Sequence, residues 1–228
     1  MKTLQSCLAV TARYLATLPT FAKLTEDDRK LLASESYLRS YDKGECLFQM
    51  DEPASHLVCL VRGSVRVYRV LPDGKEKVIH LVRAPALIAE APTFLGGAYP
   101  SSAACTTDCL VVAIPRKALL GAATRLPELP WRMMAELFSR LRELTRSLEA
   151  HSQQSGVVRV ASFLIGLGHG KSAVDLPAAK KDVANYLGLR AESFSRALSA
   201  LQKTGAIEVT DRQILIVDRD QLEQVLVE

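Results

Sequence analysis

The sequence has no hydrophobic run long enough to cross a membrane. A membrane-spanning helix needs roughly 20 apolar residues, whereas the apolar segment 109–114 has the length of one buried strand. Only six residues precede Cys7, which leaves no room for the apolar core of a lipoprotein signal. We therefore expect a cytoplasmic protein without a membrane segment. Its N-terminus is expected to form a short amphipathic helix with one apolar face, made of Leu4, Leu8, Leu15 and Leu18.

Histidine is scarce, and the sequence motifs of catalysis are missing. The four histidines are isolated, and no His-x-His pair exists of the kind that strand-barrel metal enzymes use. Neither a nucleophile motif nor a glycine-rich phosphate loop is present. We therefore predict that the protein is not an enzyme, with a metal-binding barrel enzyme as the weaker alternative. The histidines are His56, His80, His151 and His169.

The remaining composition is that of a folded protein with a mild positive charge. Hydrophobic residues make up 48% of the 228 residues, which excludes disorder as the dominant state. The five cysteines are an odd number in a chain large enough to build a core without disulfides, which indicates a reducing compartment. The net charge of +4 permits nucleic-acid binding but does not establish it.

Residues 37–115 have the pattern of short strands separated by turns. Val65, Val67 and Val70 lie in an alternating stretch that ends at the Pro-Asp-Gly turn 72–74. Such a turn between two strand patterns predicts a hairpin, because Pro presets one turn residue and Gly accepts a positive φ. Several short strands at regular intervals predict an antiparallel barrel or jelly roll. We assign residues 1–128 to this β-barrel sensor domain.

A long helix is predicted from about residue 130 to 152, since residues 131–152 contain neither Pro nor Gly. Its apolar residues recur at intervals of three and four, which is the a/d pattern of a coiled coil. A helix packed on its own domain is the alternative, because two heptads fall short of a secure coiled coil. We predict a homodimer and assign residues 129–155 to the dimerisation helix and hinge. The expected interface residues are Met134, Leu137, Leu141, Leu144 and Leu148.

The C-terminal part, residues 156–228, has the pattern of a winged helix-turn-helix: two short helices, 179–187 and 191–203, and then a hairpin. Gly188 lies where the turn needs an unusual backbone angle. Residues 131–204 hold 11 Lys and Arg against 6 Asp and Glu, a concentration of positive charge that suits a phosphate backbone. The alternative is an ordinary all-helical core. The predicted DNA-binding residues are Glu192, Ser193, Ser195, Arg196, Lys180, Lys181 and Arg190.

This arrangement of parts resembles the CRP/FNR superfamily of bacterial transcription regulators, and the resemblance covers nearly all of the chain. Its most specific stretches are Val183–Leu189 and Glu192–Arg196. The Glu-x-x-Ser-Arg pattern of the second stretch is similar to the FNR-type recognition helix, which reads a TTGA-like half-site. Segments 89–91 and 94–100 are most similar to the Dnr branch. That branch consists of regulators of dissimilatory nitrate respiration that respond to nitric oxide through haem.

The resemblance also implies an effector pocket. Cyclic-nucleotide members of the superfamily place a Glu on the ribose and an Arg-Ser pair on the cyclic phosphate. Glu90 matches the first role, but Pro100 stands where the Arg is expected, followed by Ser101 and Ser102. A buried phosphate without a guanidinium would keep its charge largely unpaired. We therefore predict that cyclic AMP is not the effector, with a cyclic-nucleotide-responsive regulator as the alternative.

Haem is the cofactor that the Dnr resemblance implies. Its axial ligand would be a His, Met or Cys, and no spacing in the sequence singles one out. An FNR-type iron–sulfur cluster needs four suitably placed thiolates near the N-terminus, and only Cys7 precedes the barrel, so no cluster is expected. Cys105 and Cys109 could meet across a turn, but small buried residues are the simpler interpretation. The cysteines are Cys7, Cys46, Cys59, Cys105 and Cys109.

The expected partners follow from the same resemblance. They are double-stranded DNA with a palindromic operator, a second copy of the chain and, if the protein is an activator, RNA polymerase. The sequence gives neither the physiological signal nor the target genes.

Overall fold

The computed structural model describes residues 2–4, 7–151, 155–168, 172–210 and 213–226. These residues form two compact units that divide between Leu141 and Arg142. Within the described ranges, no helix is long and apolar enough to cross a membrane.

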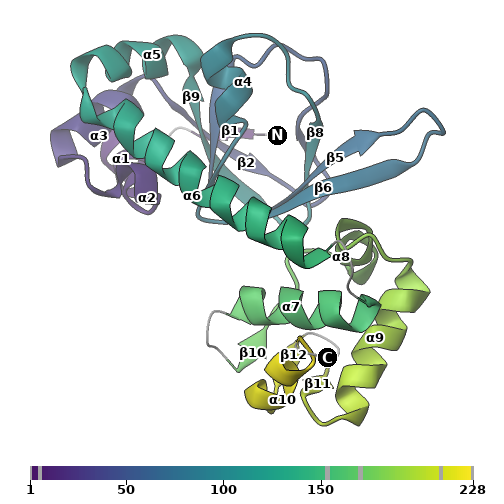
Figure 1. Ribbon diagram of the computed structural model, residues 1–228. Helices are drawn as coiled ribbons and strands as arrows, with labels where there is room; N and C mark the ends of the chain where they lie inside the picture. The colour runs from purple at the N-terminus through teal and green to yellow at the C-terminus, as the bar shows by residue number, and fades with distance from the viewer. Residues whose placement is uncertain (1, 5–6, 152–154, 169–171, 211–212, 227–228) are drawn as a thin grey trace. The chain divides into compact units, whose positions relative to one another are not determined.

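Two antiparallel sheets make up the centre of the first unit (Figure 1). The five-stranded sheet has the order β1 (Lys2–Leu4), β2 (Tyr37–Tyr41), β9 (Cys109–Pro115), β4 (His56–Arg62) and β7 (Ala86–Ile88). The four-stranded sheet has the order β3 (Cys46–Phe48), β8 (Ser102–Cys105), β5 (Ser64–Val70) and β6 (Glu76–Arg83). The predicted antiparallel β domain is confirmed.

The central strands β4 and β9 are buried on both faces, which explains their nearly continuous apolar sequences. Leu57 and Ile114 belong to a core between the five-stranded sheet and the helices that cover it. Leu60 and Val111 belong to a second core between the two sheets. The covering helices are α1 (Leu8–Ala16), α2 (Pro19–Ala22), α3 (Glu26–Ser34) and α5 (Arg116–Arg125).

The predicted N-terminal helix is correct only in its central part, where α1 runs from Leu8 to Ala16. Leu4 lies in strand β1, where it pairs with Leu38 of β2. Leu8 begins α1 but is exposed, and Leu18 lies beyond the end of that helix. At Leu4, backbone pairing with the edge of the sheet therefore determines the structure, although its spacing from the other leucines suggests a helix.

The predicted hairpin is present as β5–β6, which projects from the sheets in Figure 1. Gly74 has a φ of +77°, and its amide donates to Leu71 O at 2.9 Å. This is the turn geometry that the Pro-Asp-Gly segment predicted.

Four helices of the first unit were not predicted: α2, α3 and α5, which cover the five-stranded sheet, and α4 (Glu90–Leu95), which interrupts the strand pattern between β7 and β8. Helix α4 follows Ala89, which has a φ of +64°. Six residues form too short a segment for helical periodicity to identify. The long helix α6 (Glu128–His151) is present as predicted.

The second unit is a winged helix-turn-helix. It contains α7 (Gly156–Gly168), α8 (Lys180–Tyr186), α9 (Ala191–Lys203) and α10 (Arg219–Gln224). The wing is a three-stranded sheet with the order β10 (Ala173–Val174), β12 (Ile214–Ile216) and β11 (Ile207–Val209). The hairpin of β11 and β12 was predicted, whereas β10 was not. Asp218 caps α10, because its side chain accepts from the amide of Gln221.

Candidate nucleic-acid interface

The turn between α8 and α9 has the hydrogen bonds that end a helix at a glycine. The amide of Leu189 donates to Ala184 O at 2.8 Å, and the amide of Gly188 donates to Asn185 O at 3.0 Å. This pair of bonds is a Schellman motif, which requires a left-handed residue at the position of Gly188. Gly188 has a φ of +67°, so the predicted role of this glycine is confirmed.

Arg159 supports this turn from α7. Its Nη1 donates to Leu187 O at 2.9 Å, at the carbonyl end of α8, where a positive charge is favourable. The same nitrogen would lie 3.4 Å from a Cβ at position 188. The sequence did not single out Arg159, because an Arg in an amphipathic helix cannot be distinguished from one whose charge is simply exposed to solvent. Arg159 therefore fixes the end of α8 and the start of the chain segment that leads into α9.

Helix α9 has one buried and one exposed face. Phe194, Leu198 and Leu201 are buried in the second unit. Glu192, Ser195 and Arg196 on the opposite face are exposed. Polar side chains at the start of the second helix of a helix-turn-helix can reach base edges in the major groove.

Hydrogen bonds within α9 determine which groups remain free for DNA. The hydroxyl of Ser195 donates to Ala191 O at 3.0 Å, so its oxygen is left as an acceptor. Arg196 Nη2 donates to Ser193 Oγ at 3.3 Å. Ser193 therefore holds the guanidinium near the N-terminal turn of the helix, where Glu192 also lies.

Three further cations surround α9 in the helix-turn-helix. Lys180 and Lys181 are exposed in the first turn of α8, and Arg190 is exposed at the N-cap of α9. Lys180 also lines a pocket of about 220 Å³ together with Thr210 and Gln213, which flank the wing turn. The structure therefore brings all seven predicted DNA-binding residues into one unit, at the starts of α8 and α9.

Helix α6 exposes an apolar stripe. Met134, Leu137 and Leu141, three of the predicted interface residues, are exposed by 37%, 40% and 57%. The side chains of Leu144 and Leu148 lie outside the described residues.

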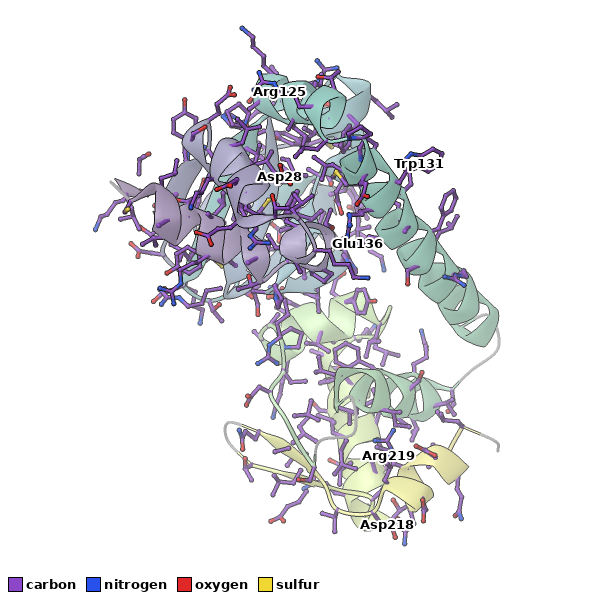
Figure 2. The ribbon with its side chains drawn as sticks, turned by 90° about the vertical axis from the view of Figure 1, so that its left-hand side faces the viewer. Asp28, Arg125, Trp131, Glu136, Asp218 and Arg219 are labelled. Carbon is purple, nitrogen blue, oxygen red and sulfur yellow. The ribbon has the colours of Figure 1, made fainter. Side chains whose placement is uncertain are left out.

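The stripe is wider than the sequence pattern predicted. Trp131 and Phe138, one heptad apart and adjacent to the a/d positions, are exposed by 72% and 62%. Figure 2 shows Trp131 pointing away from the first unit and Glu136 pointing toward it. Glu136 accepts a hydrogen bond from Thr20 at the start of α2. Thus one side of α6 packs on its own unit, and the other side presents large apolar side chains to solvent.

The first unit contains a pocket at the predicted effector position. It has a volume of about 170 Å³, and Glu90, Ser101 and Pro100 line it together with mainly apolar side chains such as Phe48. Ser102 is not among its lining residues, because its hydroxyl accepts from the amide of Met50 at 2.9 Å. No Arg or Lys is among the described lining residues.

An arginine that the sequence did not single out lies next to this pocket. Arg69 of β5 donates from Nε to Pro100 O at 2.7 Å. This bond directs the guanidinium to the backbone of the segment where the phosphate-binding Arg is missing. His80 of β6 is also among the lining residues and is exposed.

The cysteines occupy different environments. Cys7 is exposed, whereas Cys59, Cys105 and Cys109 are buried. Burial raises the pKa of the Cys59 thiol well above its ordinary value. Among the described residues, no group of three or more His, Cys, Asp and Glu side chains could hold a metal ion.

Comparison with known proteins agrees with this geometry. Residues 38–125 match the cyclic nucleotide-binding domain, and residues 158–225 match the Crp-like helix-turn-helix domain. Transcriptional activator protein FnrA of Stutzerimonas stutzeri is 26% identical over 189 residues, which cover 79% of this chain and 76% of FnrA. The structure of FixK2 from Bradyrhizobium japonicum is similar, with a TM-score of 0.75 and 27% identity, over 83% of this chain and 96% of FixK2.

A third similar protein spans almost the whole chain. It is a candidate cAMP-binding regulatory protein from Silicibacter pomeroyi DSS-3, with 31% identity and a TM-score of 0.68, over 96% of this chain and 99% of that one. The β domain and the winged helix-turn-helix thus define a DNA-binding transcription regulator. The chain belongs to the CRP/FNR family of these regulators.

The Dnr branch remains a prediction. The structure of DNR from Pseudomonas aeruginosa has a TM-score of 0.52 and 28% identity, over 97% of this chain and 100% of DNR. The TM-score to FixK2 is higher. The comparisons therefore do not single out Dnr among the branches of the family.

Proposed function

We propose that this regulator binds as a homodimer to a palindromic operator with TTGA-like half-sites, under the control of a signal sensed by its N-terminal unit. The observation that carries the proposal is the start of α9. Glu192, Ser195 and Arg196 are exposed there, on a helix whose opposite face is buried in the second unit.

The three side chains have the hydrogen-bonding groups that a G·C pair within TTGA requires. Arg196 can donate two hydrogen bonds to guanine O6 and N7, and Glu192 can accept one from the amino group of cytosine. Ser195 acts as an acceptor, because its hydroxyl proton is used on Ala191 O. It therefore suits an amino group of a neighbouring base in the major groove.

Lys180, Lys181 and Arg190 are assigned to the phosphates. They are exposed at the starts of α8 and α9. A helix N-terminus carries partial positive charge, which adds to the attraction of the side chains for phosphate. These contacts position the protein on DNA but carry no sequence information.

The exposed stripe of α6 supports the homodimer. Large apolar side chains gathered on one exposed helix face mark an interaction surface. The a/d spacing of Met134, Leu137 and Leu141 matches a second copy of the same helix. A two-fold dimer places its recognition helices about 34 Å apart, so the half-sites are inverted and one helical turn apart.

The signal is a separate part of the proposal. The pocket that contains Glu90 has a volume of about 170 Å³, below the range of about 300–1,000 Å³ typical of ligand sites. Its described lining does not fit a haem, which is wider than this space. Haem binding and nitric-oxide sensing therefore rest on the Dnr resemblance alone, and no step of the mechanism is assigned to haem.

RNA polymerase remains a further proposed partner. The relative FnrA is named a transcriptional activator. An activator of this class acts by contacting the polymerase, so we extend this partner to the present chain.

A binding measurement tests the proposal. Fluorescence anisotropy would compare the wild-type protein on a TTGA palindrome and on a scrambled duplex of the same length and composition, at one fixed salt concentration. We expect an affinity at least about 10³-fold higher for the palindrome. Equal affinities would leave only the non-specific phosphate contacts and would contradict the proposal.

A further inference from the structure

The turn between β8 and β9 begins and ends with a cysteine. Cys105 is the last residue of β8, and Cys109 is the first residue of β9. Their side chains are hydrogen-bonded to each other, and the two residues are only 3% and 2% exposed. A thiol pair in contact needs little movement to reach the disulfide S–S distance of about 2.05 Å. Because β8 and β9 belong to different sheets, a bond here would join the two sheets at this turn.

The surroundings give the two thiols different roles. Cys109 Sγ lies 3.3 Å from both Ser64 O and Thr107 O. The hydrogen bond from the Cys105 thiol lowers the pKa of Cys109. The same contact, together with burial, raises the pKa of Cys105. The contact between the two thiols therefore favours ionisation of Cys109 over ionisation of Cys105.

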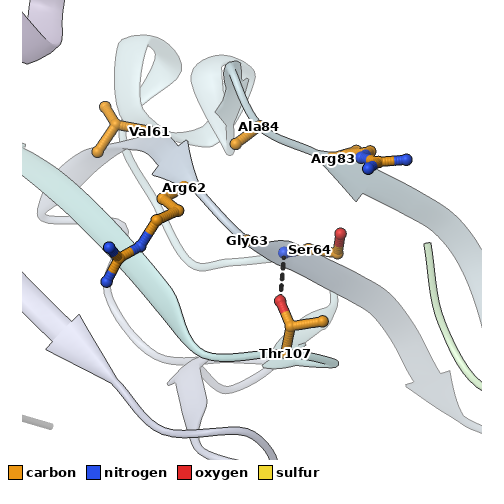
Figure 3. Close-up of a pocket in the computed structure, with 7 residues that line it drawn as sticks. All are labelled: Val61, Arg62, Gly63, Ser64, Arg83, Ala84 and Thr107. Carbon is orange, nitrogen blue, oxygen red and sulfur yellow. Dashed lines mark hydrogen bonds between the residues drawn. The ribbon is translucent and has the colours of Figure 1, made fainter. Parts of the chain in front are cut away.

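A pocket is lined by Gly63 and Thr107, two residues that lie close to Cys109. It has a volume of about 300 Å³ and is lined by Val61, Arg62, Gly63, Ser64, Arg83, Ala84 and Thr107 (Figure 3). A Cβ at Gly63 would lie 2.7 Å from Cys109 Sγ. Only the bare backbone of Gly63, which has a φ of +95°, therefore separates the pocket from the sulfur at this point.

The pocket also has a suitable composition for a small polar reagent. Figure 3 shows Arg62 and Arg83 extending to opposite sides of its opening. The hydroxyl of Thr107 accepts from the amide of Ser64 at 3.0 Å and so holds the floor of the pocket over the cysteine turn.

We propose that Cys105 and Cys109 form a reversible redox site, in which a hydroperoxide that enters through this pocket oxidises the dithiol to an intramolecular disulfide. The thiolate of Cys109 attacks the peroxide, the O–O bond breaks, and Cys109 becomes a sulfenic acid while an alcohol or water leaves. The sulfur of Cys105 then attacks the sulfur of Cys109. The S–O bond breaks, and the hydroxide leaves as water with the proton of Cys105. Two thiols and one hydroperoxide thus give one disulfide, one alcohol or water, and one water.

The other cysteines are less suited to this reaction. Cys59 lies in the separate core between the five-stranded sheet and the helices. Cys46 donates its thiol to Phe48 O at 3.0 Å and to Ala103 O at 3.2 Å, and no residue of its strand β3 is among the described lining of the pocket. Cys46 on β3 is nevertheless the nearest alternative partner for Cys105, because β3 pairs with β8.

Mass spectrometry of the full chain tests the proposal. The reduced protein would be treated with one equivalent of hydrogen peroxide, and the remaining thiols would be alkylated. Trypsin then releases residues 84–116 as one peptide, which contains Cys105 and Cys109 and no other cysteine. We expect this peptide to lose two hydrogens and to escape alkylation at both positions, and dithiothreitol to restore both thiols.

Single variants separate the two roles. In Cys105→Ser, Cys109 should stop at the sulfenic acid and be trapped by dimedone. In Cys109→Ser, Cys105 should remain alkylatable under the same exposure. Cys59→Ser is the matched control and should form the disulfide as the wild type does. Circular dichroism would verify that each variant is folded.

Three outcomes would overturn the proposal. The first is a 84–116 peptide that keeps two alkylatable thiols while Cys7 is oxidised. The second is a disulfide between Cys46 and Cys105. The third is oxidation of the pair only in urea, because the site would then be closed in the folded protein.

Discussion

Arg196 and Lys180 are both exposed cations of the helix-turn-helix, but they are expected to recognise different parts of the DNA. Arg196 lies on the exposed side of α9, where Ser193 holds its guanidinium. Arg196→Ala should cost about 1–3 kcal/mol of binding free energy on the palindrome and relax the preference at the guanine. Anisotropy titrations with the guanine replaced in both half-sites would measure this. An equal loss on matched and scrambled DNA would make Arg196 a phosphate contact.

Lys180→Ala is the matched variant for a phosphate contact. It should weaken binding to all sequences alike, because a phosphate carries no base information. The slope of log affinity against log salt concentration should become shallower by about one unit. A titration series at several salt concentrations on both duplexes measures the slope. A loss confined to the palindrome would assign Lys180 to base recognition instead.

Arg159 shows what could not be predicted at the scale of residues. The sequence identified Gly188, because a tight turn between two helical patterns needs a residue with a positive φ. It identified Glu192, Ser195 and Arg196, because they are polar positions in an amphipathic helix. Nothing in the sequence distinguished Arg159 from a solvated charge. Its bond to Leu187 O depends on how α7 packs beside α8, and this tertiary packing cannot be read from the sequence.

Arg159→Met tests the support of the turn between α8 and α9. The variant keeps much of the apolar volume but removes the donor to Leu187 O, so we expect a loss of about 1–2 kcal/mol in the free energy of unfolding of the second unit. Arg159→Lys keeps a cation near the carbonyl and should lose less. Hydrogen exchange at the amides of Gly188 and Leu189 would report the opening of the turn. Unchanged exchange in Arg159→Met would contradict this role.

At the scale of elements, the periodic patterns were the most reliable guides. The long helix, the helices of the helix-turn-helix and the β5–β6 hairpin were predicted, because each has a repeated pattern or a specific turn signal. Strand β1, helices α2 to α5 and strand β10 were not predicted, because short segments take their structure from what they pack against. Leu4 is the clearest example, since its spacing suggests a helix while β2 offers a sheet edge.

The exposed stripe of α6 makes a specific prediction for this element. Leu141 is 57% exposed in the single chain, so Leu141→Glu should leave the fold intact. In a dimer, it would place two like charges in a desolvated seam, at a cost of several kcal/mol. Light scattering at micromolar concentration should show a dimer for the wild type and a monomer for the variant. Ser139→Glu, at an exposed position outside the a/d stripe, is the control and should remain dimeric.

Trp131 provides a second readout of the same interface. It is the chain's one tryptophan and is 72% exposed in the single chain. If dimerisation covers Trp131, the emission maximum of the wild-type protein should lie at a shorter wavelength than that of the monomeric Leu141→Glu variant. A wild-type protein that remains monomeric at micromolar concentration, with DNA present, would contradict the dimer.

At the scale of the whole molecule, the N-terminal unit is expected to respond to a ligand other than cyclic AMP. No cation is among the described lining residues of the pocket with Glu90, and Arg69 is bonded to the carbonyl of Pro100. Calorimetry should therefore detect no micromolar binding of cyclic AMP, and cyclic AMP should not tighten DNA binding. Micromolar binding would show that Arg69 or another cation can reach the phosphate.

Haem binding by the same unit is tested separately, because it rests on the Dnr resemblance alone and the described lining of the pocket with Glu90 does not fit a haem. Protein reconstituted with haem should show a Soret band that shifts when nitric oxide is added. The absence of this band after reconstitution would remove haem from the account. If the Soret band is present, His80→Ala would test whether the exposed imidazole of His80 is a ligand of the haem iron.

The central claim is that a two-fold dimer reads inverted half-sites one helical turn apart, and the spacing of the half-sites tests it most directly. One series of duplexes would carry the TTGA palindrome with zero, about 5 or about 10 additional base pairs at its centre, about 10 being one turn of B-DNA. Half a turn places the second half-site on the opposite face of the helix. We predict that the insertion of half a turn lowers the affinity to that of a single half-site. Affinity that does not depend on the spacing would contradict the account.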